Sequence, residues 1–444
     1  MKTIDNKLLK AAFVLILAFG LASCSKNDNP VDSNMGSSTV SGRITTSDGL
    51  PKSPAKASTV QATQGGVQGA TVILAQVQAD GSLKTVSTNA VQTDAAGKFT
   101  VNTNLSGVNN IIVVANQGST EWKARVSSTL QSGTTVYAPP LNTKSTTEAD
   151  LYIKIVSQSH AQDVDESDLK LLMDSDVAAQ IKGDDNAQAQ IINAMAAKYQ
   201  ATSQAAVNSY FGFSNSQMQA MASARANAKA KLDQALYASG DSDDETDNDV
   251  NDYEGTVIAA SSSSNISASS YAELMRIGLT AFINATSSMS AQAKFAVAKS
   301  FSKRYAFVLS YAMQEQFTAA GASNAQINAV SSAGNTLYAS IKSSTDVSQI
   351  TDAYVQYRSS IQSELKLTLS AYASIIDSIN TTINTGAKTT LVSITSSGAS
   401  FSSLVNAYIT FFTSIKSSTQ ASFTGASSAQ VNAASQILIL ANMN

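Results

Sequence analysis

Between residues 39 and 143, apolar and polar positions alternate with a period of two, as in strands that have one buried face. The alternation runs from Val40 to Ile44 and returns in residues 67–77, whereas 111–114 is a wholly apolar run. Turns rich in Asp and Gly separate these segments. The pattern predicts an antiparallel β-sandwich over residues 39–143.

Parts of this region resemble the carboxypeptidase regulatory-like family. The residues that carry the resemblance are Val40-x-Gly42-x-Ile44, GVQGATVIL at 66–74 and TDAAGKF at 93–99. The resemblance covers residues 38–142 and implies a transthyretin-like β-sandwich. In its third stretch, Asp94 can accept hydrogen bonds from the N–H groups of a turn, Gly97 can adopt a positive φ, and Phe99 can enter the core.

After residue 143 the apolar spacing changes to three and four, which predicts helices. The clearest stripe runs from Tyr354 to Ile383, and we expect one long helix that starts at Thr351/Asp352 and stops at Gly386. Capping boxes predict further helix starts. These boxes are Ser145/Glu148, Ser214/Gln217, Ser270/Glu273 and Ser323/Gln326.

The helical part contains an internal repeat. Residues 321–331 (GASNAQINAVS) and 425–435 (GASSAQVNAAS) agree at 8 of 11 positions, and a weaker copy begins at Ser216. The repeat predicts tandem helical units, with coincidence in an Ala/Ser/Gln-rich chain as the alternative. We divide the part into a helical unit over 145–255 and a helical bundle over 256–444.

The first residues resemble the leader of a bacterial lipoprotein. Lys2, Lys7 and Lys10 precede a short apolar run that ends in LASC at Cys24. The run is too short to span a membrane and suits a signal peptide. The resemblance implies cleavage after residue 23 and lipidation of Cys24.

Residues 24–38 are predicted to form a flexible tether. The tether looks like those common among Bacteroidetes lipoproteins, and Ser25 after the Cys fits sorting to an outer membrane. Whether the protein faces the periplasm or the outside is left open.

Composition excludes several classes of function. The chain has one Cys, one His (His160) and a formal net charge of -3. This excludes a disulfide scaffold, a Cys/His zinc site and a basic nucleic-acid footprint. A zinc carboxypeptidase site needs two His and a Glu, so no such peptidase site can exist in this chain.

The acidic run over residues 241–254 is the only candidate for a cofactor-binding site in the sequence, and the cofactor would be a Ca²⁺ ion. Carboxylate oxygens in a flexible loop suit Ca²⁺. The candidate ligands are Asp243, Glu245, Asp247, Asp249 and Glu254. The sixth position is Asn248, where an EF-type loop needs Gly, so a solvated acidic linker is the competing interpretation. We also expect the basic pair Lys303-Arg304 to lie on a solvated face.

These features predict a membrane-anchored, non-catalytic lipoprotein: a cell-envelope scaffold or accessory protein that binds a partner protein or itself. The alternative is a surface lipoprotein that binds a glycan or a peptide. Its ligand would be held by loops 51–65 and 116–121 or by a helical groove. We expect no enzymatic activity and no nucleic-acid partner.

Overall fold

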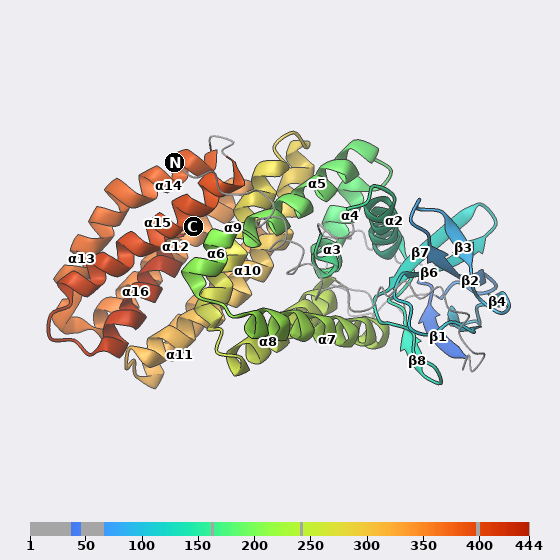
Figure 1. The fold of residues 1–444 in the computed structure, drawn as a ribbon, viewed down its shortest axis with the longest axis horizontal. Coiled ribbons are helices and arrows are strands. Elements are labelled where there is room, and N and C mark those ends of the chain that lie inside the picture. Colours follow the sequence, from blue (N-terminus) through green and yellow to red (C-terminus); the bar gives the residue numbers. More distant parts are fainter. Residues whose placement is uncertain (1–36, 46–65, 161–163, 240–242, 397–399, 444) are drawn as a thin grey trace, which may run out of the picture.

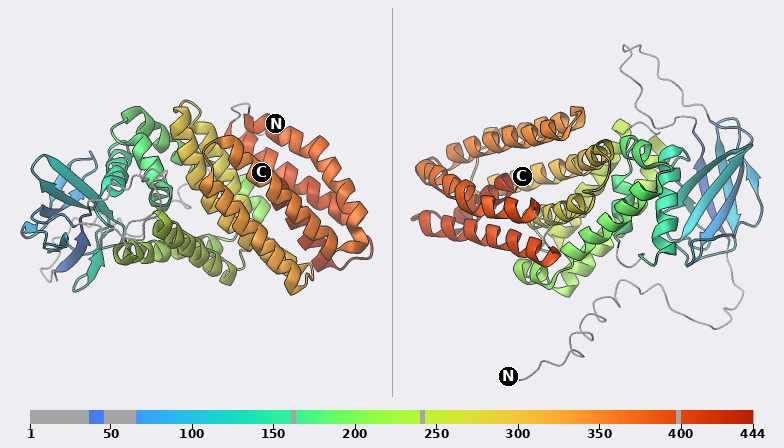
Figure 2. Two further views of the ribbon diagram at one scale, coloured as in Figure 1. Left: turned by 180° about the vertical axis from the view of Figure 1, so that it is seen from behind. Right: turned by 90° about the horizontal axis from the view of Figure 1, so that it is seen from above.

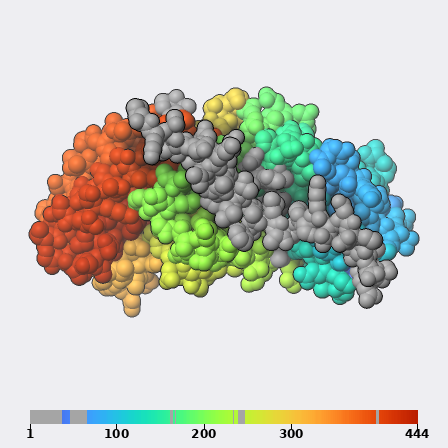
Figure 3. All heavy atoms as spheres, in the orientation of Figure 1, coloured from blue at the N-terminus to red at the C-terminus, as the bar shows by residue number. Residues whose placement is uncertain are grey.

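The structure is a computed structural model that describes residues 37–45, 66–160, 164–239, 243–396 and 400–443. A β-sheet region comes first along the chain and a mostly helical region follows. The β-sheet region lies at one end of the elongated molecule and the C-terminal helices lie at the other (Figure 1, Figure 3). Cys24 and loop 51–65 lie outside the described residues.

The strands of the described residues form two sheets. The first has the order β5-β1-β8; the second has the order β3-β2-β6-β7, with β4 also paired to β2. The strands are β1 (Ser38–Arg43), β2 (Thr71–Val77), β3 (Leu83–Thr85), β4 (Val91–Gln92), β5 (Lys98–Thr103), β6 (Ile111–Gln117), β7 (Thr120–Val126) and β8 (Thr135–Tyr137). Most pairs are antiparallel as expected, but β1 and β8 run parallel.

The turn before β5 has the conformation that the sequence predicts. Asp94 Oδ1 accepts hydrogen bonds from the backbone N–H groups of Ala96 (2.9 Å) and Lys98 (2.8 Å). Gly97 has φ +73°, and Phe99 is buried in the core between the sheets. This turn therefore delivers β5 to its place beside β1.

The second sheet is buried on both faces, which explains the uninterrupted apolar run of β6. On one face, Ile111 and Val113 join a core shared with the first sheet. On the other face, Ile112 and Val114 belong to the same hydrophobic cluster as the helices. The β-sheet region is therefore built into the helical region through a common core.

Helices make up most of the chain after residue 142. The first of them, α2, packs against β7, and Lys123 Nζ lies 3.0 Å from Asp150 Oδ1 across this contact. Figure 2 shows the helical region extending away from the sheets. They are α2 (Thr143–Ser157), α3 (Glu166–Leu172), α4 (Ser175–Ile181), α5 (Asp185–Thr202), α6 (Ala205–Phe211), α7 (Asn215–Ser239), α8 (Asp243–Ser263), α9 (Ala268–Ala285), α10 (Ala291–Ala319), α11 (Asn324–Ser343), α12 (Val347–Thr368), α13 (Ala373–Thr382), α14 (Lys388–Ser396), α15 (Phe401–Ser422) and α16 (Ser428–Asn442).

Some of the expected helix starts are confirmed. Ser214 and Gln217 form a reciprocal box at the start of α7, and Ser323 and Gln326 do so at α11. The starts at Ser145 and Ser270 are wrong, because Asn142 and Ser267, each three residues earlier, are the caps of α2 and α9. Ser145 Oγ instead donates a hydrogen bond to the carbonyl of Lys123 in β7.

The segment from Tyr354 to Ile383, which was expected to form one long helix, is divided among several helices. It starts at the cap Asp346, and a 3₁₀ turn, η1 (Ser370–Tyr372), separates α12 from α13. The expected stop at Gly386 is also wrong, because a π-helical segment, η2 (Ile383–Ala387), carries the chain into α14. The apolar stripe is buried as predicted, but its axis is interrupted.

The repeated sequence forms the same turn in each of its two clear copies. Gly321 and Gly425 have φ +87° and +85°, values that suit glycine at a helix C-terminus. A capping box follows each glycine and opens α11 or α16. The repeat thus encodes the link of a helical hairpin, α10–α11 in one copy and α15–α16 in the other.

The boundary predicted at residues 255/256 falls inside α8, so it does not separate two helical units. The same helix includes most of the acidic run over residues 241–254. The interpretation of that run as a linker is therefore wrong for residues 243–254, which are helical, and Asp247 and Glu254 within it are buried. Among the described residues, no helix is long and apolar enough to cross a membrane.

Candidate functional site

The basic pair Lys303-Arg304 lies in the interior, and the expectation of a solvated face is wrong. The two residues are 8% and 5% exposed, in the middle of α10. The sequence contains a signal for this: Arg304 follows Phe301 by three positions and precedes Val308 by four, so it lies on the apolar stripe of its helix. Burying such cations requires carboxylate partners.

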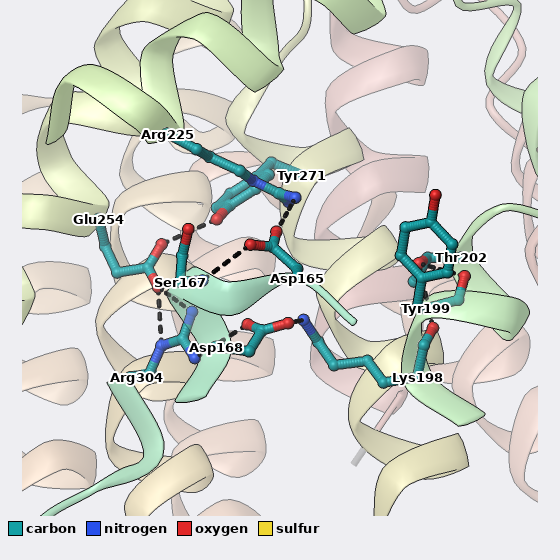
Figure 4. Close-up of polar contacts among 10 residues, drawn as sticks. All are labelled: Asp165, Ser167, Asp168, Lys198, Tyr199, Thr202, Arg225, Glu254, Tyr271 and Arg304. Atoms are coloured by element: carbon teal, nitrogen blue, oxygen red, sulfur yellow. Dashed lines mark hydrogen bonds and ion pairs between the residues drawn. The ribbon is translucent and has the colours of Figure 1, made fainter. Parts of the chain in front are cut away.

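Glu254 of α8 is the main partner of Arg304. The guanidinium donates from Nε (2.8 Å) and from Nη2 (2.5 Å) to Glu254 Oε1. The hydroxyl of Tyr271 in α9 donates to the other carboxylate oxygen at 2.9 Å. Glu254 is 0% exposed, so these charge-assisted hydrogen bonds replace its contacts with water (Figure 4).

Two aspartates of α3 extend the network. Asp168 lies 3.4 Å from Arg304 Nη1 and also pairs with Lys198 of α5. Asp165 accepts from Arg225 of α7 at 2.8 Å and caps α3 through the N–H of Ser167. Burial favours the neutral form of Asp165, but Arg225 and Lys198 lower its pKa below the usual range.

Lys303 makes a second group of ion pairs. Its Nζ lies 2.7 Å from Asp247 Oδ1 of α8 and 3.3 Å from Asp174 Oδ2, the cap of α4. Lys342 of α11 approaches Asp247 Oδ2 at 3.0 Å. Burial alone would lower the pKa of Lys303, but Asp174 and Asp247 raise it. Lys303 therefore stays charged at neutral pH.

The pairs around Lys303 and Arg304 are called the α10 network here: Asp165, Asp168, Asp174, Lys198, Arg225, Asp247, Glu254, Tyr271, Lys303, Arg304 and Lys342. Its members come from helices far apart in the sequence, and each charge faces an opposite one. The network fixes which helices are neighbours. Its charges are engaged with one another.

The calcium candidates whose side chains are described, Asp247, Asp249 and Glu254, form no metal-binding group. Asp247 and Glu254 are two turns apart on α8, about 10 Å along the helix, and each pairs with a cation of α10. Asp249 is half-buried, and the side chains of Asp243 and Glu245 lie outside the described residues. In the described part of the chain no three His, Cys, Asp or Glu side chains form a group able to hold a metal. Calcium binding stays a prediction, without a geometric basis here.

A small pocket borders the α10 network, with room for about one water molecule. Asp174, Asp247, Lys303 and Tyr338 line it. The pocket is too small to hold a glycan or a peptide.

Sequence reasoning missed most members of the α10 network. Asp165 and Asp174 looked like ordinary polar residues, and nothing local marks them as partners of a distant Arg225 or Lys303.

Of the predicted binding elements, turn 116–121 is the exposed link from β6 to β7, and loop 51–65 is not described. His160 follows the end of α2, as expected.

No protein-family model, curated protein or solved structure matches this chain. The resemblance of residues 38–142 to the carboxypeptidase regulatory-like family therefore stays a prediction. The functional argument depends on the residues and on their geometry.

Proposed function

We propose that this chain is a bacterial outer-membrane lipoprotein, anchored through Cys24, that acts as a non-catalytic cell-envelope scaffold or accessory interaction protein. The β-sheet region would be a carboxypeptidase regulatory-like domain with a transthyretin-like fold. The helical region would present the interaction surface.

The α10 network is the observation that carries this proposal. Its charges pair with one another between helices far apart in the sequence, which supports a structural role for this part of the protein. The common core of sheets and helices supports the same function, because a rigid body can hold a partner at a fixed distance from the membrane.

The alternative is a surface lipoprotein that binds a glycan or a peptide. The exposed β6–β7 turn at 116–121 is compatible with such a role. The two functions differ in behaviour: a scaffold holds a partner protein or itself, whereas a binding protein gains thermal stability from its ligand.

Membrane fractionation and crosslinking of the tagged full chain in bacterial cells test the proposal. We expect the wild type and a Ser25→Ala control in the membrane fraction, and Cys24→Ser outside it. Crosslinking should give one stoichiometric partner or links between copies of the chain. Membrane retention of Cys24→Ser would overturn the anchor, and absence of protein crosslinks would overturn the scaffold.

A further inference from the structure

One buried carboxyl group of α9 lies outside the α10 network. Glu273 is 1% exposed, and its Oε1 has no hydrogen-bond partner among the described residues. Burial without hydrogen-bond donors disfavours the charged form of a carboxyl group. Burial therefore raises the pKa of Glu273 to about 8, although the charge of Lys416 opposes this change. Glu273 thus gains or loses its charge close to neutral pH.

Two hydrogen bonds show which part of α15 lies opposite Glu273. The hydroxyls of Thr280 in α9 and Tyr408 in α15 are 2.7 Å apart, and Asn284 Nδ2 donates at 2.8 Å to a carbonyl of α14, the helix just before α15. Later positions of α9 thus meet earlier positions of this segment, so α9 and α15 run antiparallel. From the contact of Thr280 with Tyr408, Glu273 is about 10 Å back along α9 and Lys416 about 12 Å onward along α15. Glu273 and Lys416 are therefore at the same level of the two helices.

Lys416 contacts α6 at this level. Its Nζ lies 4.6 Å from the ring centroid of Tyr210, and the rings of Tyr210 and Phe412 have centroids 5.6 Å apart. Burial and the charge of Glu273 both raise the pKa of Tyr210, and the hydroxyl of Tyr210 has no hydrogen-bond partner among the described residues. A cation is attracted to the face of an aromatic ring, but a buried carboxylate attracts it as well. Lys416 thus has two competing partners, the ring of Tyr210 and the carboxyl group of Glu273.

The helix α6 is held in place by few interactions of its own. It spans Ala205–Phe211, and Val207 is its one fully buried residue. Gln204, at its N-terminus, makes no capping hydrogen bond with its side chain. A helix this short gains most of its stability from packing, and α6 packs against α15 (Figure 1). The contacts of Tyr210 with α15 are therefore important for the position of α6.

Among the charged groups of the described helices packed against α9, only Lys416 affects the pKa of Glu273. Glu254 of α8 and Lys198 of α5 are paired within the α10 network, and α16 has no ionisable side chain. Further ionisable side chains on these helices are Tyr271 and Arg276 of α9, Tyr199 of α5, Tyr305, Tyr311 and Glu315 of α10, Tyr408 of α15 and Lys388 of α14. Among the described side chains, Lys416 is therefore the cation that ionised Glu273 attracts.

We propose that Glu273, Lys416 and Tyr210 form a proton-controlled latch that holds α6 against α15. When Glu273 is neutral, Lys416 lies over the ring of Tyr210, which is the arrangement in the structure. When Glu273 loses its proton, the buried carboxylate draws Lys416 away from the ring, and α6 loses one of its contacts with α15. The latch goes beyond the scaffold function, because it makes one part of the helical surface respond to pH, and it does not depend on the membrane anchor.

A nitroxide label on α6, followed by electron paramagnetic resonance, tests the latch in the folded full chain. Cys24→Ser removes the one native cysteine, and Ser209→Cys places the label at an exposed position of α6. We expect the mobile fraction of the label to rise at least about twofold between pH 7 and pH 9, reversibly and with a midpoint near the pKa of Glu273, about 8. The matched control is a label at the exposed Ser359 of α12, whose mobility should stay constant.

Two substitutions in the labelled chain separate the members of the latch. Glu273→Gln stays neutral, so the label on α6 should be as immobile at pH 9 as at pH 7. Lys416→Met removes the cation, so the label should already be mobile at pH 7 and should change little with pH. The latch would be overturned by constant mobility of α6 in the labelled chain without these substitutions. An equal rise in Glu273→Gln or in Lys416→Met, or an equal rise at Ser359, would also overturn it.

Discussion

The α10 network and the surroundings of Arg276 lie in the same helical region, yet they accommodate a cation in different ways. Lys303 and Arg304 face Asp174, Asp247 and Glu254 at ion-pair distances. Arg276 of α9 lies beside an aromatic ring instead, with its guanidinium carbon 5.7 Å from the ring centroid of Tyr305. Helix packing thus accommodates some cations through carboxylates and another through an aromatic ring.

The largest expected effect comes from removing the cation of the α10 network. Arg304→Met leaves Glu254 and Asp168 without their shared partner, and we expect a loss of about 3–5 kcal/mol in the free energy of unfolding. Chemical denaturation followed by circular dichroism measures this. Lys294→Met, in the first turns of the same helix, should change the free energy by about 0.5 kcal/mol or less.

The double variant Arg304→Met/Glu254→Met sharpens this comparison. It removes both charges of the buried Arg304–Glu254 pair, so much of the lost stability should return. If the double variant is as unstable as Arg304→Met alone, the loss of stability comes from the changed packing of the side chains and not from the lost charge pair.

A smaller effect should appear with pH at Glu273. Burial raises its pKa from 4.5 to about 8, so the folded state binds this proton more tightly than the unfolded chain does. The resulting stability is complete below pH 4.5 and is lost as the pH rises through 8. Near pH 7, where much of this stability is already lost, Glu273→Gln should therefore be more stable than the wild type by roughly 3 kcal/mol.

Unfolding free energies of both proteins at several pH values measure this difference. Glu364→Gln, on α12, is the control and should follow the wild type at each pH. A constant difference between Glu273→Gln and the wild type across the pH range would contradict the raised pKa.

The smallest expected effects come from two matched tyrosines. Tyr271→Phe removes the hydroxyl that donates to Glu254 and should cost about 1–2 kcal/mol. Tyr305→Phe removes a hydroxyl that has no hydrogen-bond partner among the described residues and should change stability by about 0.5 kcal/mol or less. Thermal unfolding of both variants measures these changes in stability. Equal changes would show that the paired hydroxyl of Tyr271 contributes no more to stability than the unpaired hydroxyl of Tyr305.

The sequence alone predicted much of the local structure, and its errors have physical causes. The turn at Asp94 and Gly97 and the caps at Ser214 and Ser323 followed from short-range chemistry. The cap at Ser145 was wrong because Asn142 lies three residues earlier and Ser145 Oγ has an acceptor in β7. Where more than one residue could cap the same helix, a hydrogen bond to a distant strand can determine which residue does so.

The candidate site was less predictable. The acidic run around Glu254 was interpreted as a linker or a calcium loop because its charges are adjacent in the sequence. It folds as a helix because Asp247 and Glu254, seven positions apart, share one face of α8 and meet the cations of α10. The partner of Glu254 is 50 residues away, and that of Asp168 is 136 residues away.

The sequence by itself determined which region forms strands and which forms helices, where several turns fall, and which faces are apolar. These depend on periods of two and of three to four residues and on side chains within one turn. Only the tertiary structure decided that the sheets and helices share a core and that Lys303 and Arg304 are buried. The reason is that an isolated charge carries no local mark of the partner that it will meet, because the packing of whole helices sets the distance between them.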